Sequence, residues 1–291
     1  MRSQTTVIVR TNHFEAGVFR SLSRTPGELR HSVARSHLIA IPRSVIAVTQ
    51  AGRGERITTP VRAVFYNKGC HYTARSVCSL RETTLFIRVP ASILADAIRP
   101  HDPRVDARRD QPLTFVDGPM SDATYLALSR LASELPRRGE TDDVLREAVG
   151  SLIEGAYAER SLRAPSRHGV KDDDYVRWAQ ELISLSIGEN IGLDEIARRV
   201  GVSASHLCQA FKRRIGMTTQ EFRACLRLRS AVDRLAAVRA PIGAIASGFG
   251  YADPAQFAME FRSRFGLTPE RVRSVLRAGV LHPAGRLARG G

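Results

Sequence analysis

The sequence predicts an α+β protein of two domains: an antiparallel β-barrel or sandwich with two following helices, and then an all-α domain in which a long helix joins two helix-turn-helix units. The chain of 291 residues is long enough for two domains of ordinary size. Its first 115 residues are rich in short β-like segments, and residues 193–266 contain one pattern twice. We expect the domains to span residues 1–162 and 172–277, with a linker at 163–171 and a disordered tail at 278–291.

The first 115 residues carry segments rich in Val, Ile, Phe and Thr, each ended by Gly, Pro or Asn. Examples are HLIAIP, VIAVTQAG, RAVFYNKG and TTLFIRVP. Segments of this kind at intervals of roughly eight to twelve residues are typical of a small antiparallel sandwich or barrel. After Pro90 we expect a short helix, and the segment from Val105 to Pro119 is expected to be irregular.

Two helices are expected next, over residues 121–135 and 141–160, because apolar residues recur at helical spacing in both. Ser121 and Asp122 are expected to cap the first. Packing onto the barrel is the default for such apolar stripes, and pairing of two subunits is a compatible alternative. Pro165 and Gly169 then interrupt the helical pattern in the polar segment that we expect to be the linker.

The repeated pattern reads IARRVGVSASHLCQAFKRRIGMT and then IASGFGYADPAQFAMEFRSRFGLT. Each copy is expected to form two short helices joined by a tight turn, with Gly201 and Gly250 ending the first helices and Ser203 and Asp253 capping the second ones. Between the copies, one helix of roughly 30 Å is expected from Thr219 to Val238. Arg223, Arg227 and Arg234 are expected on its non-apolar faces. Asp172, Asp173 and Asp174 are expected at a helix start, where negative charge complements the helix dipole.

Charge favours a polyanionic partner. Lys and Arg number 44 against 29 Asp and Glu, a net charge of +15, and 18 basic against 9 acidic residues lie from Tyr175 to the end. The four cysteines show neither CxxC nor zinc-finger spacing, so we expect reduced thiols in a cytosolic protein and no structural metal. These cysteines are Cys70, Cys78, Cys208 and Cys225. Cys225 is expected in the core, and Cys208 is expected to be a small filler facing a groove rather than a redox switch. No signal peptide or membrane span is indicated.

Residues 175–277 resemble the DNA-binding domain of the AraC/XylS family of bacterial transcription regulators. The double helix-turn-helix, the RLRSAVDRL run and the segment IASGFGYADPAQFAMEFRSRFGLTPERVR carry this resemblance. The first domain resembles, more loosely, the cupin-like effector-binding and dimerisation domain of that family, on the strength of FYNKGCHYTARS. Cys70 departs from that pattern, since a polar or acidic residue is usual there.

The resemblance implies two sets of base-facing residues. They are Ala204, Ser205, Cys208 and Gln209 in the first unit, and Ala255, Gln256, Met259 and Glu260 in the second. A glutamine amide can pair with N6 and N7 of adenine, whereas no arginine is present to pair with guanine, and Glu260 could accept from a cytosine amine. We therefore expect specificity to depend on the first unit and on DNA shape, and the second unit to supply affinity. The candidate phosphate contacts are Lys212, Arg213, Arg262 and Arg264.

The barrel lumen is expected to take a small organic effector. Its candidate ligands are Tyr66, His71 and Tyr72. Effector binding is expected to change how the first domain holds the second domain or a partner subunit. His31, His37 and His71 with Glu82 could form a metal set, but they lack the tight spacing of an enzymatic cupin, so no metal or other cofactor is expected.

Together these features predict a sequence-specific transcription regulator rather than an enzyme, binding double-stranded DNA and a small-molecule effector in the bacterial cytoplasm, at the nucleoid and not at a membrane. A homodimer is an open alternative, and RNA polymerase would be a partner of an activator. Two other classes stay open. A DNA-repair alkyl acceptor would need a cysteine-rich zinc module, and a cupin-type metalloenzyme fused to a DNA-binding module would need bound metal.

Overall fold

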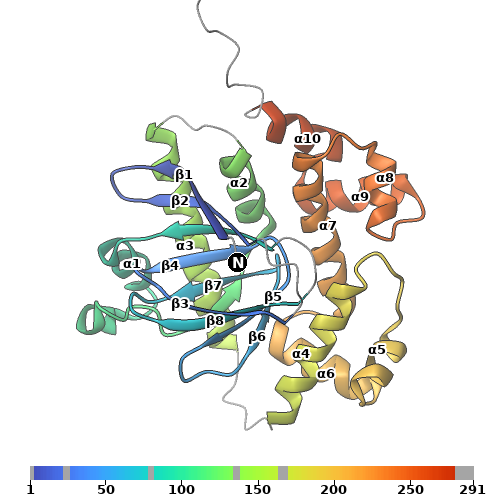
Figure 1. Ribbon diagram of the computed structural model, residues 1–291, viewed down its shortest axis with the longest axis horizontal. Coiled ribbons are helices and arrows are strands. Elements are labelled where there is room, and N and C mark those ends of the chain that lie inside the picture. The colour runs from blue at the N-terminus through green and yellow to red at the C-terminus, as the bar shows by residue number, and fades with distance from the viewer. Residues whose placement is uncertain (1–2, 22–26, 78–81, 134–137, 163–169, 279–291) are drawn as a thin grey trace, which may run out of the picture.

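The structure, a computed structural model, describes residues 3–21, 27–77, 82–133, 138–162 and 170–278. Most of the expected linker and tail, and Cys78, lie outside these residues. Two stacked β-sheets with helices form one part of the molecule, and a helical part lies beside it (Figure 1). The predicted α+β architecture is confirmed.

Among the described residues, ten antiparallel strands make up the two sheets of the first domain. The larger sheet has the order β1 (Ser3–Arg10), β2 (Glu15–Ser21), β9 (Glu82–Arg88), β4 (Leu38–Pro42), β7 (Arg62–Tyr66) and β10 (Asp117–Pro119). The smaller sheet has the order β3 (Leu29–Val33), β8 (His71–Ser76), β5 (Ile46–Gln50) and β6 (Arg56–Thr58). The four segments singled out in the sequence become β4, β5, β7 and β9.

The helices of the first domain are α1 (Ala91–Ile98), α2 (Asp122–Ser133) and α3 (Arg138–Leu162). The segment expected to be irregular is more ordered than predicted, because it holds part of the 3-10 helix η1 (Pro103–Arg108) and the strand β10, which pairs with β7. The side chain of Asp102 accepts a hydrogen bond from the Arg104 amide and so caps η1.

The two helices that follow the sheets pack differently. Helix α3 contacts β10 and α1, as expected for a helix that packs onto the barrel. Helix α2 contacts α3 and also lies against α7, α9 and α10 of the second domain, and its stripe of Tyr125, Leu128 and Leu131 is buried in the core that these elements share. In this arrangement the stripe is covered by the chain itself rather than left open for a second subunit.

Seven helices make up the described second domain. They are α4 (Val170–Leu185), α5 (Leu193–Val200), α6 (Ala204–Ile215), α7 (Thr219–Ala237), α8 (Ile242–Gly248), α9 (Pro254–Phe265) and α10 (Pro269–Ala278). The turns before α6 and α9 need the left-handed backbone of Gly201 and Gly250, whose φ angles are 85° and 80°. The long helix ends one residue before its predicted end. Cys225 on this helix is fully buried, which confirms its expected place in the core.

Candidate nucleic-acid interface and its link to the first domain

The second helices of the two units, α6 and α9, are built alike. Ser203 and Asp253 cap their starts, each accepting a hydrogen bond from a backbone amide, as predicted. The apolar anchors at matching positions, Leu207 with Phe257 and Phe211 with Phe261, are fully buried. Because one face of each helix is anchored in the core, the opposite face is turned to solvent.

Most of the predicted base-facing residues lie on this outer face. Ser205, Gln209, Ala255, Gln256 and Met259 are exposed, Met259 to 67%. The remaining three, Ala204, Cys208 and Glu260, are half-buried.

In the structure α6 and α9 correspond at an offset of 50 residues. The two predicted base-facing sets correspond at an offset of 51, so they differ from the structural alignment by one residue. At matched positions Gln209 corresponds to Met259, and His206 corresponds to Gln256. His206 is exposed on α6, and the sequence interpretation omitted it. The sequence could have indicated His206, because the repeat has an offset of 50 at Phe211 and Phe261, and this offset places Gln256 opposite His206.

The two glutamines have different surroundings. Gln256 donates its amide to Glu260 (3.0 Å), and Glu260 also accepts from the Tyr251 hydroxyl (2.9 Å). Burial and this carboxylate raise the pKa of Tyr251, so its hydroxyl stays a donor. Gln209, by contrast, has no side-chain hydrogen bond within the described part of the chain. Glu260 therefore holds one amide in place, and the other is free to turn.

The four candidate phosphate contacts fall into two pairs. Lys212 and Arg262 are exposed and form no ion pair with any described residue. Arg213 pairs with Asp172 (3.2 Å), and Arg264 pairs with Asp122 (2.9 Å). Two of the four cations therefore already have a carboxylate partner when DNA is absent.

The acidic run at the start of α4 contacts α6. Asp172 lies 3.0 Å from the imidazole of His206 and also pairs with Arg213, while Asp173 pairs with Arg214 (3.0 Å). These aspartates therefore do more than complement a helix dipole, because they also hold both ends of α6 against α4.

A buried arginine of α7 joins the two domains. Arg229 is only 2% exposed, and its guanidinium donates to Asp122 (2.8 Å) and to the carbonyls of Pro60 (2.9 Å), Val61 (3.1 Å) and Met120 (2.5 Å). All four acceptors belong to the first domain. Asp122, expected to cap α2, bonds instead to the second domain, and Ser121 alone caps the helix by accepting from the Thr124 amide.

A second polar cluster lies next to this arginine. Tyr125 of α2 donates to Asp233 of α7 (2.9 Å), and Arg43 donates to Ser129 (2.6 Å) and to Asp233 (3.0 Å). The Arg43 guanidinium also stacks over the Tyr125 ring at 4.3 Å. Helix α7 is thus held along one side by α2.

Arg62 of β7 joins the sheets to the first unit. It bonds to Asp117 (2.5 Å) and to both oxygens of Glu159 (2.9 and 2.6 Å), and it lies 3.4 Å from the carbonyl of Ile215 at the end of α6. Burial alone would raise the pKa of Asp117, but Arg62 and Arg56 outweigh it and lower the pKa to about 2. The Asp117 carboxylate is therefore charged at neutral pH.

A cavity of about 680 Å³ lies between the two sheets. Alternate residues of several strands line it, for instance Leu38 and Ala40 of β4 and Tyr72 and Ala74 of β8. Of the predicted effector ligands, Tyr66 and Tyr72 line this cavity, with ring centroids 4.7 Å apart. His71 does not line it.

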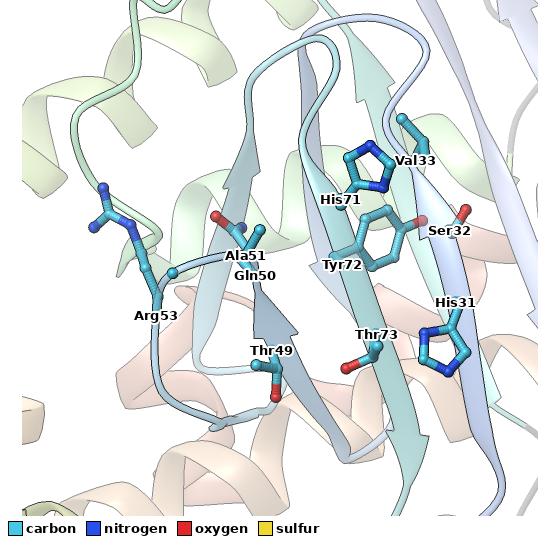
Figure 2. Close-up of a pocket in the computed structure, with 11 residues that line it drawn as sticks. His31, Ser32, Val33, Thr49, Gln50, Ala51, Arg53, His71, Tyr72 and Thr73 are labelled. Carbon is cyan, nitrogen blue, oxygen red and sulfur yellow. The ribbon is translucent and has the colours of Figure 1, made fainter.

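His71 lies in a separate groove on the outer face of the smaller sheet. Figure 2 shows this groove, with His71 on β8 and His31 on the neighbouring strand β3. Both imidazoles are exposed.

The histidines considered as metal ligands have other surroundings. His37 is buried, and its Nδ1 accepts a hydrogen bond from the Lys68 amide (3.2 Å), while burial lowers its pKa. Glu82 pairs with Arg30. Within the described ranges, no three His, Cys, Asp or Glu side chains cluster in a way that could hold a metal ion.

A family model described as a helix-turn-helix domain matches residues 196–274. This span runs from α5 into α10 and includes α6 and α9. Residues 196–274 form an AraC-type helix-turn-helix DNA-binding domain. None of the helices in the described part of the chain is long and apolar enough to cross a membrane.

The curated relatives that match this region are named as regulators, two of them as regulators of operons. The lactose operon transcription activator of Staphylococcus xylosus is 26% identical over 98 residues, which is 34% of this chain and 35% of that protein. The Msm operon regulatory protein of Streptococcus mutans is 23% identical over 99 residues, 34% of this chain and 36% of that protein. The matches thus span about a third of the length of each relative.

Solved structures similar to the chain include an AraC-type regulator of Chromobacterium violaceum, 27% identical, covering 37% of this chain and 96% of that one with a TM-score of 0.35. ToxT of Vibrio cholerae is 13% identical and covers 91% of this chain and 99% of that one, with a TM-score of 0.39.

Proposed function

We propose that the chain is a sequence-specific transcription regulator that inserts α6 and α9 into adjacent major grooves of DNA. The observation that carries this proposal is the pair of matched, outward-facing recognition helices at the two ends of α7. Helix α7 has 19 residues and is therefore roughly 28 Å long. Successive major-groove faces on one side of B-DNA lie about 34 Å apart, so a connector of this length supports binding of both units to one side of a duplex.

The two units would divide the work of recognition unequally. Gln209 on α6 has a free amide for adenine, next to the exposed hydroxyl of Ser205. On α9 the matched position is Met259, which can only contact a thymine methyl. Gln256 remains a reader there, with its amide oriented by Glu260. The first unit would therefore provide more of the base preference, and the second more of the affinity.

Binding-site profiling of the full-length protein tests both parts of this proposal. Enrichment of a defined site from a random duplex pool is expected for the wild type, and no enrichment would refute sequence-specific binding. Gln209→Ala is expected to lose more base preference than Gln256→Ala, and an equal or greater loss for Gln256→Ala would contradict the unequal division. Gln4→Ala, at an exposed glutamine of β1 in the first domain, is the matched control.

We further infer that a small-molecule effector in the cavity between the sheets regulates how the first domain holds the second. Tyr66 and Tyr72 would form part of its site. The shared carboxylate of Asp122 supports this coupling, because it binds both the buried Arg229 and Arg264 of the second recognition helix. While Asp122 holds Arg264, that guanidinium cannot also pair freely with phosphate.

Asp122→Asn tests this coupling. The substitution removes the charge but keeps an acceptor for Arg229, so DNA affinity and its salt dependence are expected to rise as Arg264 becomes available to phosphate. Fluorescence anisotropy with a selected duplex would measure both. If the same substitution has an equal effect in an Arg264→Ala background, the contact does not restrain α9.

A further inference from the structure

The cavity between the sheets contains one ion pair whose polar atoms are only partly satisfied. Arg30 of β3 donates to one oxygen of Glu82 at the start of β9. The two side chains are 13% and 4% exposed. Arg30 Nη1 and Glu82 Oε2, the remaining donor and acceptor of the same pair, are buried and have no hydrogen-bond partner among the described residues. A buried donor or acceptor without a partner costs free energy, so a ligand that hydrogen-bonds to both atoms would gain affinity.

The charge of the pair selects among ligands. Arg30 and Glu82 neutralise each other, so an anion placed on Arg30 Nη1 would lie close to the Glu82 carboxylate, and a cation placed on Glu82 Oε2 would lie close to the guanidinium. An uncharged group with one acceptor and one adjacent donor meets neither repulsion. The guanidinium is further fixed over the Phe19 ring, at 5.1 Å from its centroid.

The other charged residues of the cavity wall do not change this balance. Arg88 is paired with Glu15 on the neighbouring strand β2, and Arg35 is exposed in the segment that leads into β4. Much of the remaining wall is apolar or aromatic, and four hydroxyl side chains also line it. The apolar and aromatic residues include Leu38, Ala40, Ile46, Val48, Tyr66, Tyr72, Ala74 and Phe86, and the hydroxyls are those of Thr5, Ser32, Ser36 and Thr84.

We propose that the cavity binds an uncharged ligand with a ring-containing apolar body and a head that presents an adjacent hydrogen-bond acceptor and donor, such as a primary carboxamide. The acceptor of the head bonds to Arg30 Nη1 and its donor to Glu82 Oε2, while the body lies against Tyr66, Tyr72 and Phe86. A volume of about 680 Å³ is in the range of small-molecule sites. The proposal rests on the proposed function, because it names the class of effector for the same cavity.

A matched pair of probes tests the proposal on the full-length protein. Naphthalene-2-carboxamide and 2-naphthoate share one body and differ in the charge of the head. Isothermal titration calorimetry at pH 7.5 is expected to show the carboxamide bound at least tenfold more tightly than the carboxylate. Equal or tighter binding of 2-naphthoate would overturn the proposal, and so would the absence of binding by both probes.

Glu82→Gln provides the sharper result. Removing the carboxylate leaves Arg30 without its anion, so 2-naphthoate is expected to gain at least tenfold in affinity and to become the preferred probe. Unchanged preference in a folded Glu82→Gln protein would overturn the assignment of the head to this pair. Thr49→Ala, on the outer face of β5, is the control and is expected to leave both affinities unchanged. If Glu82→Gln does not fold, the comparison of the two probes in the wild type still decides whether the cavity prefers the uncharged head.

DNA binding measured in parallel separates this proposal from the proposed function. A wild-type protein that enriches a defined DNA site but binds neither probe would refute the ligand class and leave the regulator intact. Absence of site-specific DNA binding would refute the regulator, whatever the probes do.

Discussion

Replacing Arg229 by Met tests whether one buried guanidinium holds the two domains together. The substitution keeps most of the apolar stem but removes every hydrogen bond to Asp122, Pro60, Val61 and Met120. Breaking a buried ion pair by removing one partner costs about 3–5 kcal/mol. Here Asp122 keeps Arg264 as a partner, but the carbonyls of Pro60, Val61 and Met120 lose the Arg229 donor. This cost is a large part of the roughly 5–15 kcal/mol by which proteins are stable.

Urea unfolding measures this loss. If the free energy of unfolding falls by about 3 kcal/mol per M of urea, the urea concentration at the midpoint is expected to fall by about 1 M or more. Trp178, the single tryptophan, lies on α4 and reports by fluorescence on the second domain, while circular dichroism reports on both. In Arg229→Met the two signals are expected to separate, since the second domain would unfold without the first.

Arg234→Met is the matched control for this experiment, since Arg234 lies on the same helix, is exposed and has no side-chain partner within the described residues. Its midpoint is expected to stay close to that of the wild type. If Arg229→Met and Arg234→Met unfold at the same urea concentration, the reasoning from the buried network is wrong.

Three further predictions concern pH, salt and base preference. Burial lowers the pKa of His37 in the folded chain, so near pH 6.5 the unfolded chain takes up a proton that the folded chain does not. Stability against urea should therefore fall as pH drops from 7 through about 6.5. His37→Gln should flatten this pH dependence, and an unchanged slope would contradict the reasoning. Lys212→Ala and Arg262→Ala should each lower the slope of log affinity against log salt by about 0.9 in anisotropy titrations, whereas unchanged slopes would exclude phosphate contacts. Glu260→Ala should release the Gln256 amide and weaken base preference at the positions read by α9, and an unaltered binding-site profile would show that Glu260 does not position it.

The second domain was the more predictable part, because its signals are local. The caps at Ser203 and Asp253 and the anchors at Phe211 and Phe261 lie within a few residues of the turns that they stabilise. Each feature can therefore be recognised in one short window, and the repeat gives every window an independent second copy. The register of the recognition helices follows from the same repeat, which is why the omission of His206 could have been avoided.

Edge strands were harder to predict than central ones. Strands β4 and β7 lie within the larger sheet and read as nearly continuous apolar runs. Strand β3, at the edge of the smaller sheet, reads LRHSV and has only Arg30 turned from solvent. A strand whose inward residue is an arginine shows no apolar alternation, so the sequence pattern did not indicate β3. Arg30, the residue that we propose to bind the ligand head, therefore lies on a strand that was not predicted.

The contacts between domains could not be read from the sequence at all. Asp122 has the local signature of a helix start, and its partner Arg229 lies 107 positions further along the chain. Arg227 was expected on a non-apolar face of α7, but it is buried, where it donates to the carbonyls of Ile187 (2.8 Å) and Glu189 (2.7 Å). The guanidinium of an arginine among apolar residues can donate its hydrogen bonds to water or to a buried carbonyl. The sequence pattern is the same in both cases, because the tertiary fold supplies the acceptor.

The two helix-turn-helix units differ in the contacts that connect them to the first domain, as they differ in the residues on their outward faces. The second unit is held through α2, where Asp122 binds Arg264 on the recognition helix itself. The first unit is held through Arg62, which reaches the carbonyl that ends α6 and leaves the outward face of that helix uncovered. Tyr66 lies on the same strand as Arg62, four residues away, and lines the cavity. A ligand that shifts β7 would therefore move the support of the base-reading helix α6 directly, whereas it could reach α9 only through α2 and the shared carboxylate.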